Sequence, residues 1–128
     1  MYSDGLTSFV SAVTEGEAGA ADITDVFFAA DVSIESFGGI TTEAWDVAGA
    51  NAAILSLDVS ADEGEGDRAE KATVTFPKTT ALGPQGSVFW STDVDLPVKV
   101  KAGGHATLEH KQAASDAGGA YRAFIVYR

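Results

Sequence analysis

The chain of 128 residues contains no cysteine, which excludes disulfides, thiolate metal sites and thiol nucleophiles. No apolar run approaches the ~20 residues that a membrane-spanning helix needs. The N-terminus lacks a basic segment followed by an apolar core, so we expect neither a secretion signal nor a membrane partner. At 128 residues, the chain is long enough for one domain with a single core.

Basic residues are absent from residues 1–67, which hold 14 acidic ones; residues 68–128 hold 8 basic and 5 acidic residues. Nucleic acid is therefore not an expected partner, because binding a phosphate backbone needs clusters of Lys and Arg. Three explanations of the acidic first half stay open: a solvated face that maintains solubility, contact between the two halves across a subunit boundary, or adaptation to high salt.

Short segments of alternating apolar and polar residues fill most of the chain, as in half-buried β-strands. In residues 71–77, for example, Ala72, Val74 and Phe76 share one parity, and lysine and threonine take the other. Turn signals recur about every 8–12 residues, as in sandwiches and jelly rolls. No segment keeps a helical apolar period for three turns. We therefore predict an all-β fold, a single jelly-roll β-sandwich of about eight antiparallel strands.

The predicted sandwich domain covers residues 23–128, and residues 1–22 are predicted to form an N-terminal arm, in which residues 7–13 could form a short strand. Residues 15–22 are small and acidic without an apolar period, which is typical of a terminal extension. Within the sandwich, residues 26–37 are predicted as one strand that Gly38 and Gly39 end, and residues 40–47 as part of the next.

Catalytic and metal-binding motifs are absent from the sequence. His105 and His110 are five residues apart, so a strand places them on opposite faces and they cannot jointly hold a metal. The acidic loop 58–67 could bind calcium, but its spacing differs from that of an EF-hand. We expect no metal or cofactor and no enzyme activity.

The last predicted strand is apolar on both faces. Tyr121, Ala123, Ile125 and Tyr127 suit the core, and the opposite face carries Phe124 and Val126 between two arginines. A strand that is apolar on both faces must be covered on both faces. In residues 87–91, Phe89 lies on the face opposite Val88 and Trp90, so this segment is also apolar on both faces. We therefore expect another subunit or the arm to cover the back of one sheet. The expected subunit-interface residues are Phe89, Arg122, Phe124 and Val126.

Four short motifs lie within residues 25–128: Phe27-Phe28-Ala29, the step 98–103, Ala117-Gly118-Gly119 and Ile125-Val126-Tyr127. They resemble motifs of the small decoration, or cement, proteins on the heads of tailed bacteriophages, and the resemblance covers residues 25–128. One departure is Gly104, which stands where that group usually has an acidic residue. The resemblance implies a jelly roll that trimerises on the capsid surface and clamps neighbouring major capsid subunits.

The expected function is thus a structural virion protein on the capsid exterior, made in the host cytoplasm. Its expected partners are itself, as a homotrimer, and the major capsid protein. Phe9, Val10 and Val13 of the arm are expected to contact the capsid, because an otherwise polar tail carries apolar groups there. The alternative is a carbohydrate- or receptor-binding β-sandwich module, and an acid-catalysed hydrolase is a third reading.

Overall fold

A computed structural model describes residues 5–15, 21–43, 54–61, 66–76, 88–90, 96–112 and 120–128. These residues form β-strands and turns, and none of them is helical, as predicted. No helix long and apolar enough to cross a membrane occurs in this part of the chain. The strands are β1 (Thr7–Glu15), β2 (Ala21–Phe27), β3 (Val32–Glu43), β4 (Ile54–Ser60), β5 (Ala69–Thr75), β6 (Val88–Trp90), β7 (Val98–Val100), β8 (His105–Gln112) and β9 (Ala120–Tyr127).

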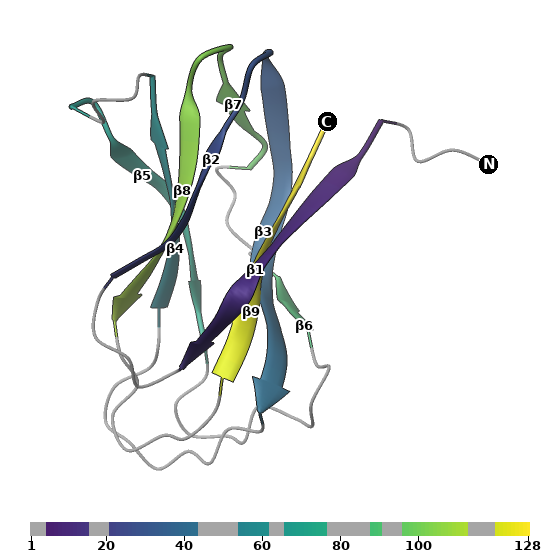
Figure 1. Cartoon of the computed structure of the whole chain (residues 1–128), viewed down its shortest axis with the longest axis vertical. Coiled ribbons are helices and arrows are strands. Elements are labelled where there is room, and N and C mark those ends of the chain that lie inside the picture. Colours follow the sequence, from purple (N-terminus) through teal and green to yellow (C-terminus); the bar gives the residue numbers. More distant parts are fainter. Residues whose placement is uncertain are drawn as a thin grey trace.

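The strands form two antiparallel sheets that pack face to face (Figure 1). The five-stranded sheet has the order β1-β9-β3, with β6 and β7 both pairing with the far edge of β3. The four-stranded sheet has the order β2-β8-β4-β5. Successive strands β1 to β4 thus alternate between the sheets, and the last two strands insert beside the first ones. This interleaving of two Greek keys is the strand order of a jelly roll.

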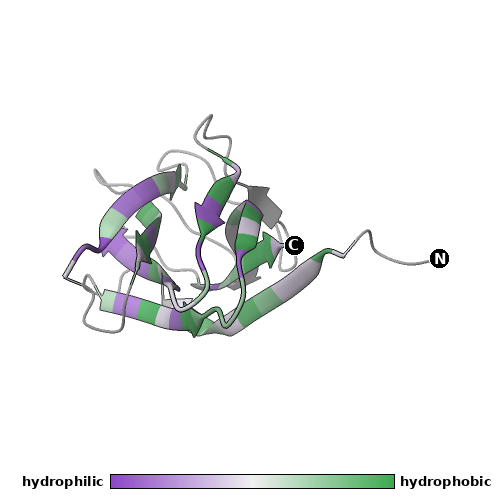
Figure 2. Ribbon diagram, turned by 90° about the horizontal axis from the view of Figure 1, so that it is seen from above, coloured by the Kyte–Doolittle hydropathy of each residue, from purple (hydrophilic) through white to green (hydrophobic). Residues whose placement is uncertain are grey.

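The core lies between the sheets and comes from alternate residues of both, as Figure 2 shows in a view along the sandwich. The predicted parity of β5 and β9 is confirmed: Val74, Phe76, Tyr121 and Ile125 are buried. Phe76 packs on Tyr121 with ring centroids 4.9 Å apart. Aromatic contacts of this kind add to the stability that buried area alone provides.

The short strand suggested at residues 7–13 is present, but it belongs to the sandwich and not to a separate arm. Thr7–Glu15 form β1, which pairs with β9 from Thr7 opposite Tyr127 to Glu15 opposite Ala120. Residues 21–22 already belong to β2. Residues 7–15 and 21–22 are therefore strand residues of the sandwich. In β1, pairing with β9 satisfies backbone groups that a solvated arm would leave to water.

Two predicted strand boundaries are also wrong. Residues 26–37 contain the end of β2 and the start of β3, with a turn through exposed Ala29 and Ala30 between them. Gly38 and Gly39 do not end a strand, since β3 runs through them to Glu43. A Cβ at Gly39 would lie 3.0 Å from Phe76 Cζ. This glycine marks a close approach of the backbone to the core rather than a turn.

The turn before β8 explains the unusual glycine at position 104. Gly103 has a φ of 88°, and Gly104 N–H donates to the Lys101 carbonyl at 2.9 Å. A Cβ at Gly104 would lie 2.9 Å from that same oxygen and 3.0 Å from the Ser60 carbonyl oxygen. An acidic side chain therefore has no room at this position.

Candidate interaction surfaces

The outer face of the five-stranded sheet is apolar. Its register places Val10 beside Phe124, with Gly38 on the far side of Phe124, and Val13 beside Arg122, with Ile40 on the far side of Arg122. Val10 and Val13 are 47% and 46% exposed, which is unusual for valine in a strand. We call this surface the apolar face, and its described hydrophobic members are Val10, Val13, Ile40, Phe124 and Val126.

The expected subunit-interface residues are only partly available on this face. Phe124 is 4% exposed, so the chain itself covers most of its surface and a second subunit is not needed to bury it. Val126 is half-buried, and Arg122 is exposed. Phe89 pairs with Gly39 in the short β3–β6 ladder, and its side chain lies outside the described part of the chain.

The expected capsid contacts divide between the two faces of β1. Phe9 lies opposite Ile125 and so belongs to the core side, where it is half-buried. Val10 and Val13 lie on the apolar face although they are three residues apart. A β-bulge between them adds one residue to the strand and restores the same direction.

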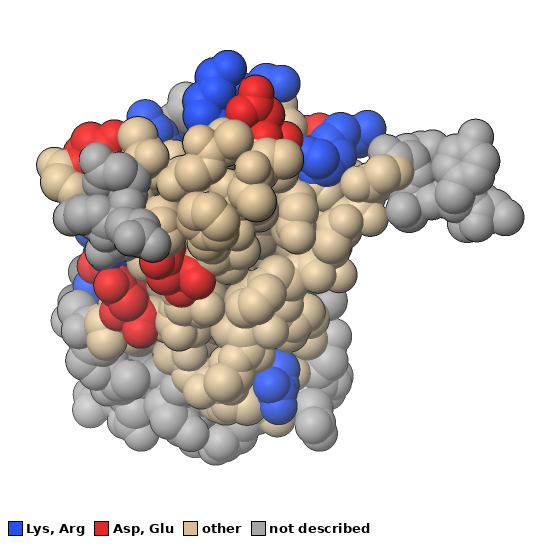
Figure 3. All heavy atoms as spheres, turned by 45° about the horizontal axis from the view of Figure 1, so that its top comes forward, with Lys and Arg blue, Asp and Glu red and all other residues tan. Residues whose placement is uncertain are grey.

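Ser11 holds this bulge in place. It is 4% exposed, and its hydroxyl accepts a hydrogen bond from Ala123 N–H at 2.9 Å and donates one to the Ala12 carbonyl at 2.8 Å. The Arg122 guanidinium donates to the Ser11 carbonyl at 3.1 Å. Figure 3 shows an uncharged surface that continues from the middle of the molecule along β1.

The outer face of the four-stranded sheet is polar instead, and Arg68 lies across it. Its Nε donates to Asp58 at 2.9 Å, its two Nη atoms donate to Asp22 at 2.9 and 2.6 Å, and Nη2 also donates to Glu109 at 3.1 Å. These three carboxylates belong to β4, β2 and β8, so a single guanidinium links strands across the sheet. We call these four residues the Arg68 cluster.

The three carboxylates of the Arg68 cluster differ in their electrostatic environment. The bidentate hydrogen bond from Arg68 lowers the pKa of Asp22. Burial raises the pKa of Glu109, and the neighbouring Asp58 adds to that rise. The hydrogen bonds from Arg68 to Asp22 and Asp58 raise the pKa of Arg68 above its usual value, so it stays charged at any working pH.

The two histidines lie on opposite faces of β8, as predicted. His110 faces the core, where Nδ1 is 2.7 Å from the Tyr121 hydroxyl, and burial raises the pKa of that tyrosine. His105 faces outward, with Nδ1 2.8 Å from Asp25. Asp25 also accepts from the Thr107 hydroxyl at 3.2 Å. Both histidines therefore have structural hydrogen bonds.

Ser60 lies opposite His105 in the β4–β8 pair, which together with Asp25 brings serine, histidine and aspartate close. Ser60 Oγ and His105 Nε2 are both buried and have no hydrogen-bond partner in the described structure. Ser60 is 2% exposed, so its hydroxyl is out of reach of a substrate. The arrangement therefore lacks the accessible nucleophile that a hydrolase needs.

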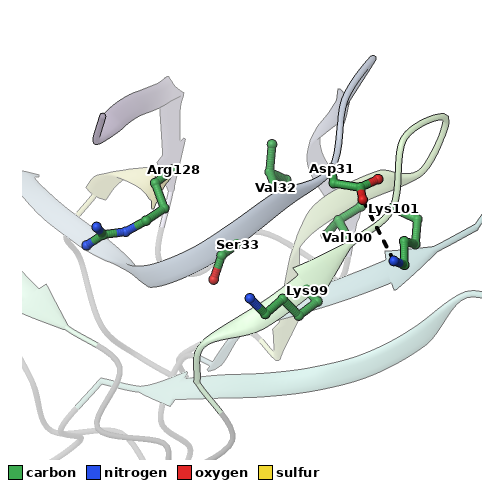
Figure 4. Close-up of a pocket in the computed structure, with 7 residues that line it drawn as sticks. All are labelled: Asp31, Val32, Ser33, Lys99, Val100, Lys101 and Arg128. Carbon is green, nitrogen blue, oxygen red and sulfur yellow. Dashed lines mark ion pairs between the residues drawn. The ribbon is translucent and has the colours of Figure 1, made fainter. Parts of the chain in front are cut away.

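Basic side chains gather at one end of the sandwich, around a hollow of about 560 Å³ (Figure 4). Lys99, Lys101 and Arg128 line it together with Asp31. Lys101 Nζ is 3.7 Å from Asp31 Oδ2, and Arg128 Nε donates to Glu35 at 2.7 Å. These pairs neutralise much of the positive charge of the hollow.

The described residues of the acidic loop do not provide a set of calcium ligands. Asp58 is engaged by Arg68, and both oxygens of Asp67 accept from Ala61 N–H at 3.0 Å. Residues 62–65 lie outside the described part of the chain. Within the described residues, no group of three or more His, Asp or Glu side chains could hold a metal.

The aromatic platform that glycan binding would need is likewise not seen among the described residues. Tyr121 is buried and Tyr127 is half-buried, while Trp45 and the side chain of Trp90 are outside the described part. Phe27, which is 55% exposed, packs edge-on against His105 with ring centroids 5.4 Å apart.

Sequence reasoning missed the Arg68 cluster and the Ser11 bulge. The available signal for the first was that Arg68 is the first basic residue of the chain, directly after the acidic loop. No pattern of short range indicates that a bulge falls at Ser11, because its hydrogen-bond partner lies 112 residues away.

Comparison with known proteins finds no protein family and no curated protein sequence that matches the chain. Two solved structures are similar over 98% of the chain: the infectious bursal disease virus VP2 subviral particle, at 10% identity and a TM-score of 0.37, and the infectious bursal disease virus Gx strain, at 12% identity and a TM-score of 0.30. The chain spans one third (33%) of each of these proteins. Both neighbours are viral particle structures.

Proposed function

We propose that the protein is a structural component of a bacteriophage virion that decorates the capsid exterior as a homotrimer and bridges major capsid subunits. It would be made in the host cytoplasm and would catalyse nothing. The motifs within residues 25–128 support this proposal, together with the jelly-roll strand order.

The contrast between the two outer faces is the observation that carries the proposal. The four-stranded sheet presents carboxylates and one guanidinium already joined to one another, whereas the five-stranded sheet presents exposed Val10 and Val13. An exposed apolar patch of this kind, on the side of the sandwich opposite the polar face, is typical of a protein that binds another protein. The apolar face is therefore the proposed contact with capsid and neighbouring subunits.

Binding to an assembled shell would stabilise it, because a ligand of the assembled state shifts the equilibrium away from disassembly. Three contacts within one trimer would act together through their high effective concentration. Bridging thus requires no single strong site, which agrees with a shallow apolar face.

The test is co-sedimentation of the protein with capsids of the phage that encodes it, followed by heating and measurement of genome retention. Val13→Asp should weaken capsid binding by at least about tenfold, because an unpaired charge at an apolar contact is costly. The matched control is Thr75→Asp, at an exposed position of β5 in the other sheet. Unchanged genome retention with and without bound protein would overturn the stabilising role.

The alternative reading, a carbohydrate-binding module, has no supporting observation among the described residues. Binding of the purified protein to a glycan array, lost on substitution of Phe27 but not of Val13, would favour that alternative over the capsid proposal.

A further inference from the structure

The edges of the two sheets are protected very differently. Natural proteins keep edge strands from pairing with other chains by making them short or by placing charges on them. The β2 edge carries Asp22 and Asp25, and the β5 edge carries Glu70 and Lys71. On the remaining edge, β6 and β7 have three residues each.

The β1 edge has neither kind of protection. It is nine residues long, and residues 5–14 contain no charged side chain. Within the described part of the chain, β1 pairs only with β9, on one side. Its N-terminal half runs outward from the sandwich body (Figures 1 and 2). Ser8 and Val10 are exposed there.

The bulge limits where another strand can pair. Between Val10 and Val13 the register shifts, and Ser11 is fixed to β9, so this part of β1 departs from regular strand geometry. The segment before it, Thr7–Val10, pairs regularly with Val126 and its neighbours. This regular segment is the part able to accept a further strand.

We propose that the segment of residues 6–10 pairs antiparallel with the same segment of a second copy of this chain across a two-fold axis. A two-fold contact brings each surface against itself, so a charged edge would meet like charge. The β2 edge would place aspartates against aspartates, and at the β5 edge Glu70 is already paired with Lys111. The β1 edge is longer than either and has no charge to oppose, so it is the edge that best suits a contact with itself.

A register with Ser8 at the axis fits the exposed side chains best. Ser8 then faces Ser8 of the second copy, and Val10 of each copy lies opposite Leu6 of the other. Val10 and Leu6 are 47% and 37% exposed in the single chain. Apolar cross-strand pairs of this kind stabilise antiparallel strands. The two five-stranded sheets would become one continuous sheet.

The inference deepens the proposed function and rests on it for its biological role. In a decorated capsid, two-fold pairing would connect neighbouring trimers to one another directly. The shell would then be held by contacts between decoration proteins in addition to their contacts with the capsid.

A single-cysteine crosslinking experiment tests the register, since the chain has no cysteine of its own. The variants are Ser8→Cys and, as a control, Thr75→Cys at the exposed edge of the other sheet. Oxidation of the full-length protein should form a disulfide-linked pair at least about tenfold faster for Ser8→Cys, because the two thiols meet at high effective concentration. Equal rates for the two variants would overturn the proposed pairing.

Sedimentation of the unmodified protein up to millimolar concentration separates this inference from the trimer. A hexamer or a larger assembly of trimers supports both proposals, and a dimer supports edge pairing while contradicting the trimer. An observed trimer contradicts edge pairing and supports the proposed homotrimer, and a monomer contradicts both proposals. Val10→Lys should return assemblies of trimers to single trimers, or a dimer to a monomer, because it replaces the apolar Val10–Leu6 pair with a charge that has no partner. The control Thr75→Lys should change neither.

Discussion

Arg68 is the residue on which the polar outer face depends. It is 21% exposed, its partner Asp58 is 8% exposed, and Asp22 and Glu109 share the same guanidinium. Arg68→Gln would leave Asp58 buried beside other acids without a cation. We expect a loss of about 2–3 kcal/mol in the free energy of unfolding, below the value for a fully buried pair because the cluster is partly solvated. Urea denaturation measures the loss, and Lys71→Gln at an exposed position of β5 should change little.

Two carboxylates of the Arg68 cluster, Asp22 and Glu109, should change the stability of the protein with pH in opposite senses. The pKa of Asp22 is lowered from 3.8, so its contribution to stability is present above that pH and is lost as the pH falls through the lowered value. The pKa of Glu109 is raised from 4.5, so its contribution is present below that pH and is lost as the pH rises through the raised value.

Melting temperatures of Asp22→Asn and Glu109→Gln, measured from acid to neutral pH, check this difference. Asp22→Asn should fall further below the unmodified protein as the pH rises from 3 to 5 or so. Glu109→Gln should gain on the unmodified protein over the same rise. Parallel curves for the two variants would contradict the assignment of these shifts.

Phe124 was expected at a subunit interface, but the structure buries it within one chain. Phe124→Asp should therefore lower the stability of the isolated chain by about 3 kcal/mol or more, since it removes a buried ring and buries a charge. Val13→Asp, on the same face but 46% exposed, should leave the stability nearly unchanged. Circular dichroism melts distinguish the two, and equal stability of both variants would restore the original assignment.

At the scale of strands, β5 and β9 could be predicted because their alternation is regular and their inward residues are large. A short strand over residues 7–13 could be predicted for β1, but its pairing with β9 could not, since the bulge at Ser11 puts Val10 and Val13 on one face and breaks the period of two. For β3, the sequence predicts a strand end at Gly38 and Gly39 because glycines usually mark turns, whereas the strand continues through them. There glycine serves the packing of Phe76 against the sheet, which no local pattern reveals.

The bulge itself can be tested through Ser11. Ser11→Ala removes the acceptor of the buried Ala123 N–H and should cost about 1–2 kcal/mol. Hydrogen exchange at the Ala123 amide should accelerate accordingly, while Ser8→Ala, at an exposed position of the same strand, should leave it unchanged. Unaltered exchange in Ser11→Ala would mean that another group satisfies this amide.

At the scale of the whole molecule, the jelly roll explains the division of charge along the sequence. Its strand order places early strands beside late ones, so Asp22 meets Arg68, Asp31 meets Lys101 and Glu35 meets Arg128 within one chain. The division of charge therefore does not require a boundary between subunits. The candidate apolar face was foreseen only in part, because its location depends on long-range pairing of β1 with β9.

These internal pairs cannot neutralise the molecule, because 19 acidic residues face only 8 basic ones. Exposed ion pairs contribute little each, about 0–1 kcal/mol. The repulsion that follows from a net charge of −11 acts on the compact state as a whole. Screening by salt should relieve more repulsion than it weakens attraction, so the melting temperature should rise as sodium chloride is added from low to physiological concentration. Potassium chloride should have the same effect at equal ionic strength. A rise that instead saturates at micromolar calcium and is abolished by EDTA would show a specific ion site, and a fall with salt would show that the internal pairs outweigh the net charge.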